Sequence, residues 1–67
     1  MKDITEVSWV ELNILLSQSY DTVELRRWIA LTLKSQRKSR KYRAIRIYGR
    51  LSAVRRMEEL KEIEEAA

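Results

Sequence analysis

The sequence predicts an all-α fold, an antiparallel helical hairpin followed by a longer C-terminal helix. The chain has no proline and a single glycine, Gly49, so the residues that end helices and build β-turns are almost absent. Hydrophobic residues make up 45% of the chain, which is too large a share for a disordered segment. Their spacing fits about three helical stretches, and 67 residues leave room for a single domain, residues 1–67.

The first helix is expected to begin near Thr5 or Ser8. Ser8 and Glu11 have the spacing of a capping box, in which the serine side chain accepts from the backbone and the glutamate reaches back. At about 100° per residue, the apolar side chains of this helix form two stripes on nearly opposite sides. One stripe holds Trp9, Leu12 and Leu16, and the other holds Val7, Val10 and Ile14. The helix therefore has two faces to bury before a polar break at residues 17–21.

The second helix is expected to start at Asp21, with Glu24 three residues later, which is the clearest helix start in the chain. Its apolar residues fall around most of the helix, with Trp28 on the main apolar face. Two short, largely apolar helices joined by a short link predict an antiparallel hairpin. Their surplus apolar faces require a third helix or a second subunit, so we expect dimerisation to complete the fold.

A third helical stretch covers residues 39–65 and has two apolar sides. The face of its first part is built by Ala44, Ile47, Tyr48, Leu51 and Val54, whereas Met57, Leu60 and Ile63 lie on a different side. Either the helix bends, at Gly49 or at residues 55–58, or its tail packs on another chain. Glutamates near a helix C-terminus oppose the helix dipole, so the acidic end at residues 58–67 is expected to fray.

Two local alternatives stay open around this stretch. Residues 34–41 are either a loop or a continuation of the second helix, because Lys, Arg and Gln favour helices while Ser35 and Ser39 are mildly adverse. A strand over residues 43–51 is the other alternative, since Ile45 and Ile47 alternate with arginines. The rest of the chain offers no second strand to pair with it.

The basic residues are concentrated in the middle of the chain. Residues 25–56 carry twelve Lys and Arg side chains and no acid, a charge of +12. Residues 1–24 and 57–67 each carry one Lys against five acids, and the sum of +12, −4 and −4 is the net charge of +4. Ordinary surfaces mix the two signs, so a block of one sign indicates a surface for a polyanion. That polyanion is either nucleic acid or the chain's own acidic ends.

A helix over the basic block is expected to carry an arginine ridge. Arg43, Arg46 and Arg50 fall within an arc of about 60°, which we expect opposite the apolar face. A planar guanidinium donates two parallel hydrogen bonds to one phosphate and keeps its charge. The neighbouring cations that complete the expected site are Arg37, Lys38, Arg40 and Lys41. The leading prediction is a small basic regulatory or accessory protein that binds nucleic acid, DNA or RNA, through this segment.

The equal and opposite acidic ends favour a second function. A chain that carries its own counter-charge needs no polyanion, so the basic segment is alternatively a surface for an acidic protein or for a second copy. Trp9, Trp28, Leu60 and Ile63 are the predicted interface residues, since tryptophan is enriched at interfaces, although core positions are the plainer interpretation of both tryptophans. A helix-turn-helix motif and a membrane-surface helix are weaker alternatives.

Catalysis fits the composition poorly. The chain has no His and no Cys, hence neither the commonest general base nor a thiol nucleophile. One glycine cannot build a glycine-rich phosphate loop, and without Cys and His there is no structural zinc site of the usual kind. We therefore expect no enzyme activity, no cofactor and no metal. With no run of about 20 apolar residues and no signal-peptide pattern, a cytoplasmic location without membrane association is expected.

Overall fold

The protein is described by a computed structural model over residues 3–66. Its elements are α1 (Trp9–Gln18), α2 (Thr22–Lys34) and α3 (Arg40–Ala66). The all-α prediction is confirmed, since the described residues form three helices and no strand. The strand alternative for residues 43–51 is wrong, because this stretch lies inside α3, as expected of a chain that has no second strand to pair with it.

Helix α1 begins where the capping signal predicted. Ser8 has an extended backbone, with φ −69° and ψ 167°, and its Oγ accepts a hydrogen bond of 3.1 Å from the backbone N–H of Glu11. The preceding residues are tied down by a turn in which the carbonyl of Asp3 accepts from the backbone N–H of Glu6 at 2.9 Å. The segment from residue 3 to residue 8 packs on the helices, because its side chains Ile4 and Val7 are buried in the core.

Helix α2 also begins at its predicted cap. The Asp21 Oδ1 accepts hydrogen bonds of 2.9 Å from the N–H of Val23 and 3.3 Å from the N–H of Glu24. At the other end, the N–H of Ser35 donates to the carbonyls of Leu31 and Thr32. The helix stops there, so the region 34–41 is resolved as a break, with a link at residues 35–39.

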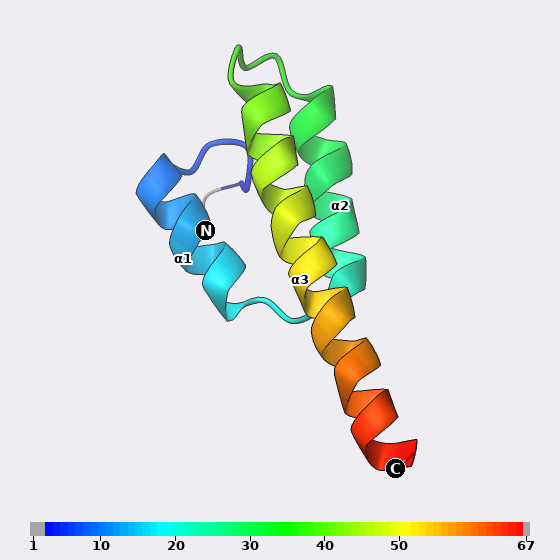
Figure 1. The fold of residues 1–67 in the computed structure, drawn as a ribbon. Helices are drawn as coiled ribbons and strands as arrows, with labels where there is room; N and C mark the ends of the chain where they lie inside the picture. Colours follow the sequence, from blue (N-terminus) through cyan, green and yellow to red (C-terminus); the bar gives the residue numbers. More distant parts are fainter. Residues whose placement is uncertain (1–2, 67) are drawn as a thin grey trace.

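Helices α2 and α3 run side by side in opposite directions, joined by that link (Figure 1). Helix α1 contacts α3 from a different side. The predicted hairpin of the first two helices is not confirmed, because α2 packs along α3. The physical reason is the length of the apolar face: α3 buries Ala44, Ile47, Leu51 and Val54 along about three turns, whereas α1 buries only Leu12 and Leu16.

The core lies where the three helices meet the segment at residues 3–8. Its buried apolar residues are Ile4, Val7, Leu12, Leu16, Leu25, Ile47, Leu51 and Val54. Burial ends at Val54, and every residue from 55 to 66 is exposed. This tail of α3 projects beyond the other helices (Figure 1, orange to red). It is helical up to Ala66, so fraying of the acidic end is not seen in the described residues, and Ala67 lies outside them.

Candidate interaction surfaces

Arg43 is a structural residue inside the fold. Only 5% of its surface is exposed, and its NH1 donates a hydrogen bond of 2.6 Å to the carbonyl of Val7. Its Nε donates to the hydroxyl of Ser39 at 3.0 Å, and its guanidinium carbon lies 4.8 Å from the ring centroid of Trp9. One side chain thus joins α3, the N-terminal segment and α1. Cation–π stacking and charge-assisted hydrogen bonds both hold it there.

Burial changes the electrostatics of this arginine. Desolvation, followed by the nearby charge of Arg37, lowers the pKa of Arg43 from its ordinary value. An arginine has such a high pKa that it keeps its proton in proteins. Arg43 is therefore a buried cation. The Val7 carbonyl, the Ser39 hydroxyl and the Trp9 ring replace the water contacts that it loses on burial.

Arg50 has an internal role at the end of α1. Its Nε donates to the carbonyl of Ser19 at 3.1 Å, and its NH2 donates to the carbonyl of Ser17 at 3.3 Å. Its guanidinium also lies 4.8 Å from the ring centroid of Tyr20. The last turn of α1 has no basic residue of its own. An arginine from α3 supplies the positive charge that a helix C-terminus favours.

The predicted arginine ridge is therefore placed differently by the structure. Arg43 does not lie opposite the apolar face, because it is buried on α3 beside Ala44 and Ile47. Arg50 is partly buried, and only Arg46 of the three is exposed. The signal that could have found this is local: Arg43 and Ile47 are four residues apart, a spacing that puts two side chains on one helix face.

The other cations of the predicted site lie together at one end of the molecule. Arg37, Lys38 and Lys41 are exposed and Arg40 is partly buried, at the link between α2 and α3 and the start of α3. Lys34 at the end of α2 is also exposed. We call these five residues the basic tip. The described chain measures 46 × 18 × 16 Å, and the acidic tail of α3 ends at the opposite end (Figure 1). The molecule is a rod with charges of opposite sign at its two ends.

Helix α3 carries an exposed apolar stripe on the side away from the core. We define this outer stripe by four side chains and their exposed fractions: Tyr42 at 72%, Ile45 at 68%, Leu60 at 61% and Ile63 at 65%. Gly49 lies between the two pairs, and a Cβ added there would meet nothing within 4 Å. The stripe consists of two apolar pairs, interrupted by Gly49 and the exposed Arg56, and exposed apolar side chains grouped on one helix face are a candidate binding surface.

The predicted interface residues lie in different environments. Trp9 is 39% exposed and is stacked under two cations, since Arg46 also lies 6.0 Å from its ring centroid. Trp28 is partly buried and packs against the core. Leu60 and Ile63 lie on the exposed tail of α3, which projects beyond α1 and α2, the helices that carry the two tryptophans (Figure 1). The four residues therefore do not form one continuous patch within a single chain.

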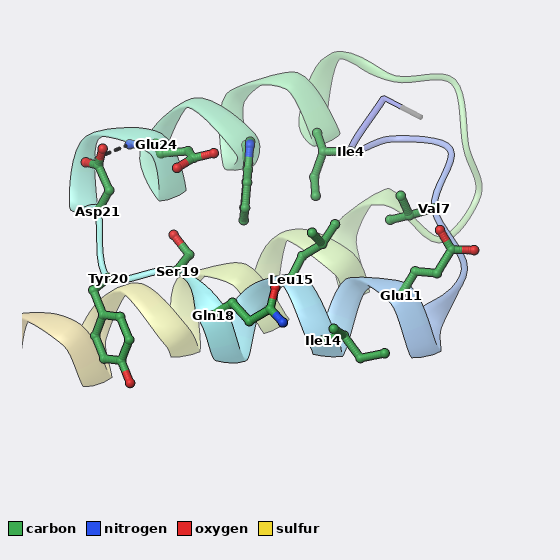
Figure 2. A pocket seen from close by; sticks show the side chains of 11 residues that line it. Ile4, Val7, Glu11, Ile14, Leu15, Gln18, Ser19, Tyr20, Asp21 and Glu24 are labelled. Atoms are coloured by element: carbon green, nitrogen blue, oxygen red, sulfur yellow. Dashed lines mark hydrogen bonds between the residues drawn. The ribbon is translucent and has the colours of Figure 1, made fainter. Parts of the chain in front are cut away.

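Two grooves flank α1. The α1–α2 groove encloses about 980 Å³, and its apolar residues include Ile4, Ile14 and Leu15, with Asp21 and Glu24 at one end (Figure 2). The α1–α3 groove encloses about 870 Å³. Its lining includes Trp9, Asn13, Tyr42, Ile45, Arg46 and Gly49, so it contains the basic end of the outer stripe.

Comparison of the chain with models of protein families, with curated proteins and with solved structures gives no match. Among residues 3–66, no helix combines the length and the apolar character needed to cross a membrane.

Proposed function

We propose that this chain is a non-catalytic protein-interaction module that works as a homodimer. The observation that carries the proposal is the outer stripe of α3, which leaves four large apolar side chains more than 60% exposed. A folded chain of 67 residues buries a modest share of its surface, so a second subunit adds the cover that its own core does not provide.

The internal roles of two arginines support this choice over nucleic acid. Arg43 and Arg50 are two of the three leading candidates for phosphate contacts, with Arg46, and both donate to backbone carbonyls within the fold. Using Arg43 for a phosphate would break a buried hydrogen bond and its stacking on Trp9. The opposite charges at the two ends of the rod also suit a protein partner, because they supply complementary surfaces without a polyanion.

The test is the oligomeric state, measured by sedimentation equilibrium over a wide range of protein concentration. The measurement is repeated with a generic DNA duplex and a generic RNA at low and moderate salt. A stable dimer that ignores both polymers supports the proposal. A monomer at every concentration, which binds either polymer, contradicts it.

Nucleic-acid binding is the second candidate, and the basic tip favours it. Lys34, Arg37, Lys38, Arg40 and Lys41 lie together at one end, within a segment that contains no acid. In this case Arg46 and the basic tip are the proposed phosphate contacts. For duplex DNA, the logarithm of the binding constant should fall by about 0.9 per neutralised phosphate for each unit of the logarithm of salt concentration. Binding that is indifferent to salt would exclude this candidate.

A further inference from the structure

Helix α3 carries two patches of the same layout and opposite charge. The basic patch is Lys41, Tyr42, Ile45 and Arg46, and the acidic patch is Glu59, Leu60, Ile63 and Glu64. Each acidic-patch residue follows its basic-patch counterpart by 18 positions, for example Arg46 and Glu64. Eighteen residues make five turns of about 3.6 residues, so the two patches lie on the same side of the helix. Each has two apolar residues in the middle and a charge on either flank.

All eight residues of the two patches are exposed. The segment between them has small side chains at Gly49, Ser52 and Ala53, which would let another helix approach closely. The same face also carries the exposed Arg56, which in an antiparallel pair would lie opposite Gly49 of the second copy. The acidic patch lies on the projecting tail, beyond the end of the core at Val54. The basic patch contributes Tyr42, Ile45 and Arg46 to the α1–α3 groove. The chain thus presents an apolar ridge with acidic flanks at one end and an apolar groove with basic flanks at the other.

We infer that the acidic patch of each copy docks on the basic patch of a second copy, with the two α3 helices antiparallel. The inference rests on the homodimer proposed above and specifies its interface. In this register Tyr42 faces Ile63 of the second copy and Ile45 faces Leu60 of the second copy. The two residue numbers of each pair average to 52.5, so the two-fold axis passes between Ser52 and Ala53. Such a contact is isologous and closes at two subunits.

The charged flanks favour the antiparallel direction. Side chains on an α-helix lean toward its N-terminus. In the antiparallel pair, Arg46 and Glu64 of the second copy share one flank and lean toward each other. They are offset by about five residues, or roughly 7.5 Å along the axis, which two long side chains can span. Lys41 and Glu59 of the second copy share the other flank at the same offset, but they lean away from each other, so the preference comes mainly from the Arg46 and Glu64 flank. The guanidinium of Arg46 already lies over the ring of Trp9, so it is held at the edge of the groove where Glu64 arrives.

The shape of the monomer leaves room for this pairing. Helices α1 and α2 cover α3 only up to about Val54, so the body of each copy lies beside the bare tail of the other. The two bodies approach each other only near the two-fold axis, where Gly49 adds no side chain. A parallel pair would set like charges against each other at both ends, which is unfavourable.

A charge exchange tests the register. Glu64→Lys alone and Arg46→Glu alone each place two repulsive pairs in the dimer, and we expect the dissociation constant to rise about tenfold or more at low salt. The double variant Arg46→Glu with Glu64→Lys restores two attractive pairs, so we expect it to dimerise within about threefold of the wild type. Circular dichroism of all three at low concentration is the control for the monomer fold. A double variant as weak as the two single variants combined would overturn the proposed pairing.

A cross-link tests the position of the two-fold axis. The chain has no cysteine, so Ser52→Cys introduces a single thiol next to the proposed axis. We expect mild oxidation to convert this variant to a covalent dimer. The matched control is Arg27→Cys, which is exposed on α2 and should stay monomeric on a denaturing gel under the same conditions. A dimer that cross-links at neither position refutes the register and leaves the proposed function standing, whereas a monomer at all concentrations refutes both.

Discussion

The internal role of Arg43 leads to a prediction that separates it from its neighbour Arg46. We expect Arg43→Met to destabilise the fold, because methionine fills much of the space but cannot donate to the Val7 carbonyl. A buried carbonyl without a partner costs about 1–3 kcal/mol, and the lost stacking on Trp9 costs about 0.5–2 kcal/mol. Burying methionine removes the desolvation cost of a buried charge, and this gain offsets part of the two losses. The net decrease in the free energy of unfolding is therefore about 2–3 kcal/mol.

Urea denaturation followed by far-UV circular dichroism and tryptophan fluorescence measures this loss. For a domain of this size, each kcal/mol lowers the midpoint of thermal unfolding by about 4–8 °C, so we expect a shift of roughly 10–20 °C. The control is Arg46→Met on the next turn, at an exposed residue that lies 6.0 Å from the Trp9 ring. At a protein concentration where the chain is monomeric, we expect that control to change the stability by less than about 0.5 kcal/mol. Equal stability losses in the two variants would refute the assignment of Arg43 as the internal anchor.

Three further substitutions test other parts of the fold by the same unfolding measurements. Gly49 is a helical glycine with open space at its Cβ position, so Gly49→Ala should stabilise the monomer by about 0.5–1 kcal/mol, and a loss of stability would show that the glycine is needed in the monomer. Thr32 is 1% exposed and its Oγ1 has no hydrogen-bond partner, so the nearly isosteric Thr32→Val should be neutral or stabilising by about 1 kcal/mol. A clear destabilisation would instead reveal a bond made by that hydroxyl. Asp21 caps α2, so Asp21→Ala should cost about 1 kcal/mol, whereas Asp21→Asn should cost little because asparagine is also a good cap.

The helix starts could be predicted from the sequence because helix caps are local. Ser8 and Asp21 bond to backbone N–H groups two or three residues away, and such bonds depend on nothing distant in the chain. The end of burial on α3 also has a sequence signal, since Leu60 and Ile63 leave the face that Val54 belongs to. The sequence therefore indicated that either the helix bends or the tail packs on another chain.

The pairing of the helices and the role of Arg43 could not be predicted in the same way. The choice of α3 over α1 as the neighbour of α2 depends on the relative lengths of apolar faces that meet only after folding. The partner of Arg43 is a backbone carbonyl 36 residues away, and a carbonyl carries no signature in the side-chain pattern. A long side chain can leave the polar face of a helix and reach into the fold, so arginine counts alone overestimate the cations available to a ligand.

The exposed tail of α3 allows the effect of a substitution on binding to be separated from its effect on folding. Residues 55–66 are all exposed, so substitutions there should change the stability of the monomer little. If the proposed pairing holds, selection on the tail and on the basic patch reports on binding, whereas selection on the buried residues among 3–54 reports mainly on folding. Among divergent copies of this sequence, the acidic and basic patches should change together in sign and spacing while the capping residues and Arg43 vary independently of them.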